Sequence, residues 1–338
     1  MKQVLIIGAD DFIGGHVVSA LAESDWAVPI AGVCRGPFKN ATNIQRVRVD
    51  ATNPEEVYEA LRRVDAVVNC LSGRPNTIAA GAKALFSAAA RVRSAPLIVH
   101  LSSMSVYGSV EGDILEDAPL RGDLGPYSRA KVHAETIAAG YPRTIILRPG
   151  CEYGPGAELW SGRIARWLLA HRVGDLGAAG DGYCNLVHVD DLVAAVLSSL
   201  QQPDAVGGVF NLAMANPVTW NEYFVLYARA LGAVPVKRIS KRRLAFEAKV
   251  LAAPLKAIEI ATRAVGLRRF SPPPIPPSLL RLIAQEIRLI TTRAQRILGW
   301  NCKPLDEGLR ETGAWFGRTT AYRGGSVTGQ TPTRLRCG

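Results

Sequence analysis

The sequence predicts an α/β protein with a doubly wound parallel sheet and a smaller, mostly helical C-terminal region. In residues 1–150, short apolar runs typical of buried strands alternate with helical patterns. This alternation is typical of a parallel sheet with helices on both faces. Beyond residue 150 the patterns are mostly helical, although a strand fits 207–212 and returns the chain to the sheet.

The elements follow from the hydrophobic periodicity along the chain. Strands are expected at 3–8, 28–34, 46–49, 66–71, 97–102 and 144–148, with helices between them at 14–23, 54–62, 76–91 and 127–139. Later helices fit 157–171, 190–201, 219–231, 242–265 and 278–290. We expect one domain over 1–150, to which 185–215 returns, and a second over 151–184 and 216–317. The tail 318–338 has few large apolar residues and is expected to be disordered.

A glycine turn follows the first strand. Val4–Ile7 is apolar and uncharged, as a strand buried on both faces requires, and the chain then reads Gly8-Ala9-Asp10-Asp11-Phe12-Ile13-Gly14. Strand, glycine turn and helix together are typical of a dinucleotide fingerprint, in which helix N–H groups face a pyrophosphate. Asp11 stands where the middle glycine is expected, and its carboxylate is electrostatically awkward beside phosphate. We expect it to cap the helix instead; the alternative is a turn that binds nothing.

Tyr127 and Lys131 are four residues apart, so both are expected on one face of the helix 127–139. An ammonium beside a phenol favours the phenolate and so lowers the pKa of the phenol. Tyr127 is therefore expected to exchange a proton with a substrate at a pH closer to neutral. Ser103 ends the strand 97–102 at the sheet edge where ligands bind, and its hydroxyl is expected to reach the same substrate oxygen. Each feature alone has a structural alternative, namely an exposed helix pair or serines that only end a strand.

Together these residues resemble the extended short-chain dehydrogenase/reductase family. The similarity runs from residue 1 to about 317 and includes Leu147–Gly156, Asn185–Leu192 and Arg293–Trp300. It implies a Rossmann domain, a nicotinamide dinucleotide and a substrate domain, with Ser103 as catalytic serine, Tyr127 as acid/base and Lys131 on the nicotinamide ribose. The positions that it implies at the cofactor are Gly8, Asp11, Phe12, Ile13, Gly14, Arg35, Asp50, Ala51, Cys70, Leu71, Ser72, Tyr127, Lys131 and Pro149.

The end of the second strand bears on the choice of cofactor. An NAD site places an acidic residue there, which accepts a hydrogen bond from the ribose 2′-OH, but this chain has Arg35 and no acid. A guanidinium matches a 2′-phosphate through paired donors, so NADP is favoured and NAD is the alternative. Asp50 has two interpretations: a contact to the adenine amino group, as in the family, or a cap of the helix that begins near Pro54.

Composition excludes several classes of protein. The six cysteines are scattered without a Cys-x-x-Cys, which argues against a zinc site and a disulfide framework and favours the cytoplasm. No metal is expected. Neither a signal-peptide pattern nor an apolar run of about 18 residues is present.

Positive charge is concentrated in the last third of the chain. Residues 231–338 carry 20 basic and 6 acidic side chains, a net of +14, whereas residues 1–230 have a net of −3. Arg242, Lys249, Lys256 and Arg263 recur every seven residues and form a basic stripe on the predicted helix. The stripe is interpreted as a solvated face or as a patch for a membrane surface or an acidic partner. Nucleic acid is not expected, because no aromatic residues interleave with the basic ones. A homodimer is left open.

The substrate is inferred mainly from an absence. Nucleotide-sugar enzymes of the family carry an arginine just before the Val189-Asp190-Asp191 stretch, and this chain has none there. The stretch is more similar to the reductase-like and hydroxysteroid-dehydrogenase-like branches. We therefore predict an oxidoreductase that transfers a hydride between a nicotinamide cofactor and an uncharged, lipid-like or polyketide-like secondary alcohol or ketone. The alternatives are an epimerase or dehydratase that acts on a sugar or nucleotide-sugar, and a dinucleotide-binding regulatory protein without turnover.

Overall fold

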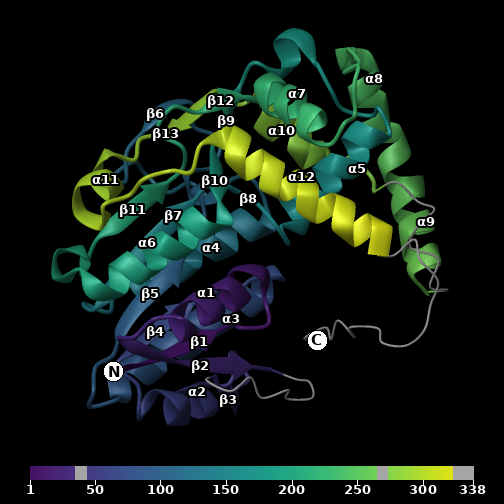
Figure 1. Ribbon diagram of the computed structural model, residues 1–338. Helices are drawn as coiled ribbons and strands as arrows, with labels where there is room; N and C mark the ends of the chain where they lie inside the picture. The colour runs from purple at the N-terminus through teal and green to yellow at the C-terminus, as the bar shows by residue number, and fades with distance from the viewer. Residues whose placement is uncertain (35–43, 265–272, 323–338) are drawn as a thin grey trace.

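The computed structural model of the 338-residue chain describes residues 1–34, 44–264 and 273–322. At its centre is a seven-stranded sheet with the strand order β11-β7-β5-β4-β1-β2-β3, in which every neighbouring pair is parallel (Figure 1). The strands are β1 (Lys2–Ile7), β2 (Ala27–Val33), β3 (Gln45–Arg48), β4 (Ala66–Asn69), β5 (Leu97–Leu101), β7 (Thr144–Pro149) and β11 (Val209–Leu212). The predicted doubly wound parallel sheet is therefore confirmed.

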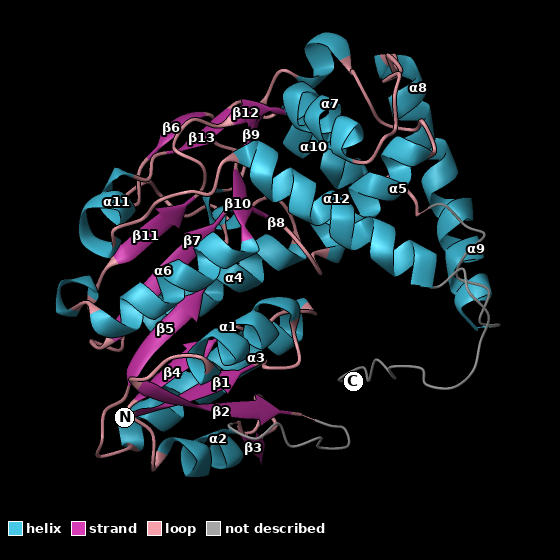
Figure 2. Cartoon of the chain, viewed as in Figure 1, coloured by secondary structure: helices cyan, strands magenta, loops and turns pink. Residues whose placement is uncertain are grey.

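Helices cover both faces of this sheet (Figure 2). Along β1, Val4 and Ile6 pack into one hydrophobic cluster, whereas Leu5 and Ile7 pack into another on the opposite face. This alternation explains why the strand tolerates no charge. The first face carries α1 (Phe12–Ala22), α6 (Val189–Gln201) and α11 (Thr292–Leu298), and the second carries α2 (Pro54–Leu61), α3 (Pro75–Arg91) and α4 (Pro126–Ala138).

The rest of the chain builds a mostly helical part beside the sheet, around a third core rich in aromatic side chains. Its helical segments are the π-helix η2 (Glu158–Gly162), α5 (Arg163–Leu169), the turn η3 (Gly177–Gly180), α7 (Trp220–Ala230), α8 (Lys241–Phe246), the π-helix η5 (Glu247–Leu251), α9 (Ala252–Ala264), α10 (Pro277–Ala284) and α12 (Leu305–Tyr322). The short turns η1 (Met104–Tyr107) and η4 (Pro203–Ala205) follow β5 and α6.

Three two-stranded sheets complete the fold. They pair β8 (Cys151–Tyr153) with β10 (Leu186–His188), β6 (Gly112–Ile114) with β13 (Ile287–Leu289), and β9 (Tyr183–Cys184) with β12 (Val218–Thr219). The β8–β10 pair is parallel and brings the two stretches that follow β7 and η3 together. In the part of the chain that is described, no helix is both long and apolar enough to cross a membrane.

The prediction of one helix over 278–290 was wrong in its second half. The helix α10 ends at Ala284, and β13 follows, with Ile287 and Leu289 buried and Arg288 facing outward. Burial of every second residue is typical of a strand and not of a helix. The Gln285 side chain also holds the chain at this point, because its amide donates to the carbonyl oxygens of Gly108 and Val110.

The prediction of a disordered tail from residue 318 was wrong for its first residues. The helix α12 continues to Tyr322, and the hydroxyl of Thr319 donates to the Trp315 carbonyl one turn back. Residues 323–338 lie outside the described part of the chain. The composition of residues 318–322 does not predict this extension. The helix starts earlier, at Leu305, and once formed it continues through residues of modest helix propensity.

Candidate active site

The residues predicted for catalysis converge at the carboxyl end of the central strands. Ser103 follows β5 and begins η1, where its oxygen accepts the Ser105 N–H at 3.2 Å. Tyr127 lies in the first turn of α4, and both Ser103 and Tyr127 line the same pocket. Lys131 lies one turn further along α4 and is buried, with its Nζ 5.9 Å from the centre of the Tyr127 ring.

The charge balance at Tyr127 differs from the one predicted. Burial of its hydroxyl raises the pKa of Tyr127 to about 12, and the Glu152 carboxylate adds to the rise, although 42% of the whole side chain is exposed. A hydrogen bond from Ser103 acts in the opposite sense and lowers the pKa. The Lys131 ammonium donates to the Leu101 carbonyl at 2.8 Å, and burial lowers its own pKa. Lys131 is not among the groups that shift the Tyr127 pKa, so the lowering that was expected from it is not observed and the net shift is upward.

A buried polar network holds α4 against the sheet. The guanidinium of Arg148, on β7, pairs with the Glu135 carboxylate on α4 at 2.6 Å, and both side chains are almost fully buried. The same guanidinium donates to the Tyr107 hydroxyl at 2.8 Å, and that hydroxyl donates to Asn211 on β11 at 2.6 Å. The network joins two strands, η1 and α4, and so positions the helix that carries Tyr127.

The glycine turn has the predicted shape, but Asp11 has a different role. Gly8 has a φ of +79°, and a Cβ on Gly14 would lie 2.1 Å from the Gly8 carbonyl oxygen, so the helix and the strand approach closely. Asp11 precedes the first residue of α1, yet its side chain accepts no hydrogen bond from the helix. Instead the carboxylate accepts the Ser72 hydroxyl at 2.8 Å and the Ser72 N–H at 3.1 Å. The prediction of a side-chain cap was wrong, because Ser72 offers two donors.

The other predicted cofactor positions fall mostly along the same sheet edge. Cys70, Leu71 and Ser72 directly follow β4, and Pro149 ends β7. Phe12 and Ile13 begin α1, next to the glycine turn. Arg35 lies outside the described residues.

Asp50 does not cap α2, so that interpretation was wrong. The cap is Asn53, whose side chain accepts the N–H groups of Glu55 and Glu56. The Asp50 carboxylate instead accepts the N–H and the hydroxyl of Thr52, next to Ala51. Asn53 directly precedes the first residue of α2, which is the position of a capping residue, whereas Asp50 lies three residues earlier. The predicted contact of Asp50 with adenine stays a prediction.

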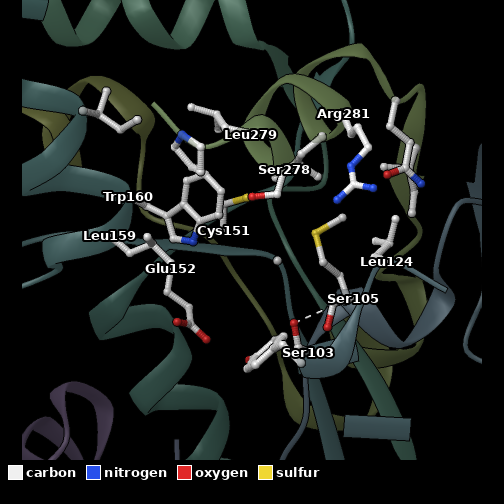
Figure 3. A pocket seen from close by; sticks show the side chains of 18 of the residues that line it. Ser103, Ser105, Leu124, Cys151, Glu152, Leu159, Trp160, Ser278, Leu279 and Arg281 are labelled. Atoms are coloured by element: carbon white, nitrogen blue, oxygen red, sulfur yellow. Dashed lines mark hydrogen bonds between the residues drawn. The ribbon is translucent and has the colours of Figure 1, made fainter. Parts of the chain in front are cut away.

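The pocket beside Ser103 and Tyr127 has a volume of about 310 Å³ and mostly apolar walls. Its apolar lining comes from the loop before α4, from η1, from η2 and α5, and from α10, and includes Met104, Leu124, Leu159, Trp160, Ile164, Trp167, Leu279 and Leu282. Figure 3 shows the guanidinium of Arg281, on α10, directed into this space. Among the described residues Arg281 forms no ion pair, and Arg163 also lines the pocket.

Sequence reasoning missed Glu152, Arg163 and Arg281. Glu152 lies on β8, between the buried residues Cys151 and Tyr153, and lines the pocket near Tyr127. The signal in the sequence was a single acid in an otherwise apolar strand just after β7. The two arginines carried no signal, because only the packing of α5 and α10 against the site brings them to it.

A second cluster of titratable groups lies at the start of α6. His188, Asp190 and Glu311 approach one another closely enough to hold a metal ion. The Lys303 ammonium lies 2.8 Å from the Asp190 carboxylate and 2.7 Å from that of Glu311, so it supplies the positive charge at this point. The cluster is therefore an ion-pair network that fastens the start of α12 to α6.

Comparison with known proteins points to one family. The model of the NAD dependent epimerase/dehydratase family matches residues 4–213, which include the glycine turn, Ser103, Tyr127 and Lys131. The chain is 29% identical over 244 residues to the 2′-dehydrokanamycin reductase of Streptomyces kanamyceticus, an alignment that covers 68% of this chain and 67% of the relative. It is 24% identical over 277 residues to the 2-alkyl-3-oxoalkanoate reductase of Shewanella oneidensis, covering 73% and 70% of the two chains.

A solved structure shows the same fold over nearly the whole length. The UDP-glucuronic acid 4-epimerase of Bacillus cereus, in complex with UDP-glucuronic acid and NAD, aligns with a TM-score of 0.69 over 94% of this chain and 99% of its own. At 18% identity this similarity concerns the fold alone.

Proposed function

The chain belongs to the NAD dependent epimerase/dehydratase family, and we propose that it is an NADP-dependent oxidoreductase that interconverts a ketone and a secondary alcohol. The observation that carries the proposal is the arrangement of Ser103 and Tyr127. Both side chains line one largely apolar pocket, the Ser103 hydroxyl is near enough to lower the pKa of Tyr127, and Lys131 lies one helical turn behind them. Two relatives whose names describe reductases support a net redox reaction.

The residues around the glycine turn fit a nicotinamide dinucleotide. The first turn of α1 receives no side-chain cap, so its N–H groups are available to a pyrophosphate. Gly14 packs directly against the backbone of Gly8, which is the close approach of helix and strand that the dinucleotide fingerprint requires. A bound nicotinamide dinucleotide supplies or accepts the hydride.

In the proposed reduction, Ser103 orients the substrate carbonyl through a hydrogen bond to its oxygen. Tyr127 donates its phenolic proton to the same oxygen as negative charge develops there. Lys131 would hold the ribose of a bound cofactor, and its ammonium would stabilise the phenolate that remains, because an ammonium favours the ionised phenol. In the oxidation, the same groups work in reverse, and Tyr127 accepts the alcohol proton.

The pocket supports a substrate with apolar groups and one acidic group. Trp160, Leu159 and Leu279 supply apolar surface, whereas Arg281 presents a guanidinium that forms no ion pair with any of the described residues. An unpaired guanidinium in a pocket favours a carboxylate or phosphate ligand. This replaces the expectation of an uncharged substrate. A 3-oxo acid, which is the kind of compound that the name of the Shewanella oneidensis relative describes, has the required combination of groups.

The experiment that tests the proposal is a scan of ketones and secondary alcohols with NADPH or NADP⁺, followed by absorbance at 340 nm. Compounds with and without a carboxylate should be paired in the panel. We expect consumption of NADPH with at least one apolar 3-oxo acid, and less with its neutral methyl ester. Conversion of a sugar or nucleotide-sugar without any net change at 340 nm, with dinucleotide retained in the intact mass of the purified protein, would instead identify an epimerase or a dehydratase.

A further inference from the structure

Glu152 is an acidic side chain that has no assigned role and lies at the centre of the candidate site. It is the middle residue of β8, opposite Val187 of β10 in the parallel register. Its two neighbours in the strand, Cys151 and Tyr153, are buried, and Glu152 lines the pocket together with Cys151. Figure 3 shows its side chain directed toward the end of the pocket where Ser103 lies. Successive side chains of a strand point to opposite faces, so the position of Glu152 in β8 determines the side to which its carboxylate points.

The charged and titratable groups around Glu152 come from several elements. Lys131 and Tyr127 lie on α4 and Cys70 follows β4, and each of the three interacts electrostatically with Glu152. Arg163 and Arg281 line the same pocket. Among acids near Lys131, Glu152 has the largest effect, and its charge stabilises the ammonium. At Tyr127 the same charge acts against the phenolate. Within the described residues, no donor hydrogen-bonds the Glu152 carboxylate.

We propose that Glu152 is a positioning residue that keeps Tyr127 in its protonated, proton-donating form, so that the site favours carbonyl reduction over alcohol oxidation near neutral pH. The proposal rests on the oxidoreductase function above. In the reduction, a bound reduced nicotinamide would supply a hydride to the carbonyl carbon, the C=O π bond would break, and the oxygen would take the proton of Tyr127. The phenolate then regains a proton from water. An ionised Glu152 favours this reprotonation of Tyr127. It also lowers the population of the Tyr127 phenolate, which is the form that alcohol oxidation requires.

The order of ionisation supports this role. Burial raises the pKa of Glu152 to about 7, and the nearby Lys131 opposes the rise. Glu152 is therefore neutral below this pH and negative above it. Tyr127 ionises at a higher pH, so it must do so beside a carboxylate that already carries charge. Like charges at close range disfavour the second ionisation. Removal of the Glu152 charge should accordingly make Tyr127 more acidic.

The test measures the ionisation of Tyr127 directly. Replacing all 9 tyrosines with 3-fluorotyrosine gives resonances that follow each phenol by ¹⁹F NMR, and Tyr127→Phe assigns the relevant one. In Glu152→Gln we expect the midpoint of that resonance to fall by roughly one pH unit or more relative to the parent. Glu152→Asp, which keeps the charge, should stay near the parent. Glu158→Gln is the matched control, because Glu158 pairs with Arg166 and does not line the pocket.

An unchanged midpoint in Glu152→Gln overturns the proposal. Circular dichroism checks that each variant is folded, and Glu152→Ala serves as the neutral variant if the Gln protein is not. Once a substrate is known, the pH profile of alcohol oxidation by Glu152→Gln should shift to lower pH by the same amount. The NMR measurement needs no turnover, so a failure of the oxidoreductase proposal is detected separately, by the absence of any redox substrate.

Discussion

The Asp11 carboxylate accepts two hydrogen bonds from Ser72, one from the hydroxyl at 2.8 Å and one from the backbone N–H at 3.1 Å. This contact joins the glycine turn after β1 to the loop after β4. The two residues are 61 positions apart in the sequence, but β1 and β4 are neighbours in the sheet. The departure from the glycine fingerprint therefore has a structural role, since the acid ties together the two loops that are expected to contact the dinucleotide.

The contact leads to a prediction for Asp11→Asn. An asparagine keeps an oxygen that accepts from Ser72 but removes a negative charge from the vicinity of the pyrophosphate. We expect NADPH to bind about 3- to 10-fold more tightly at low salt, with the gain reduced by added salt. Cofactor fluorescence titration measures this, and Asp25→Asn, an exposed acid beyond the far end of α1, is the control. Binding that weakens tenfold would show that the Asp11 charge itself helps to hold the cofactor.

The buried pair of Arg148 and Glu135 predicts a loss of stability. Glu135→Ala leaves the guanidinium buried without its carboxylate, and such losses typically cost about 3–5 kcal/mol. The free energy of unfolding from urea denaturation is the measurement. Glu59→Ala is the matched control, because Glu59 pairs with Arg62 on the surface of α2 and exposed pairs contribute about 0–1 kcal/mol. Equal effects of the two substitutions would contradict the role assigned to the buried network.

Substitution of the proposed catalytic residues should separate chemistry from binding. Tyr127→Phe removes the proton that moves, and we expect turnover to fall ~10²–10⁴-fold while cofactor binding is kept. Ser103→Ala should lose less, because it removes one hydrogen bond to the reacting oxygen. Lys131→Met should damage both turnover and cofactor binding. Steady-state kinetics and cofactor titration decide the matter, and a Tyr127→Phe protein with more than about a tenth of the parent rate excludes Tyr127 as the acid/base.

The predicted preference for NADP over NAD rests on Arg35. If its guanidinium contacts the 2′-phosphate, Arg35→Ala should weaken NADPH binding by ~1.5–3 kcal/mol and leave NADH binding almost unchanged. Arg46→Ala, a basic residue on β3, is a control for the loss of one positive charge on this edge of the sheet. Equal affinities of the parent for NADPH and NADH would remove the basis for the prediction.

The basic stripe leads to a prediction about membranes. Arg242, Lys249 and Lys256 are exposed, and Phe246 and Val250 on the same helical stretch are 53% and 54% exposed. The Arg263 side chain lies outside the described part. If this surface meets anionic lipid, the protein should co-sediment with anionic vesicles and not with neutral ones, and the binding should fade with salt. A Lys249→Glu/Lys256→Glu variant that sediments like the parent would show that the stripe is a solvated face.

Much of this protein can be read from its sequence because local patterns carry the information. The uncharged run Val4–Ile7, the glycine turn after it and the strand–helix alternation determine a doubly wound sheet, since a strand buried on both faces tolerates only apolar residues. The spacing of Tyr127 and Lys131 places both on one face of α4. The position of Ser103 at the sheet edge follows from the end of the strand before it. Such features depend on neighbours within a turn or two of the chain.

The tertiary structure alone decided the rest. Asp11 turned from a helix cap into a partner of Ser72, and residues 287–289 became a strand because β6 was available to pair with them. The pairing of β8 with β10 places Glu152 in the pocket that Tyr127 also lines, and the packing of α10 brings Arg281 to the same pocket. In each case the deciding partner is distant in sequence. The free energy of such contacts depends on burial and mutual geometry, which no local pattern contains.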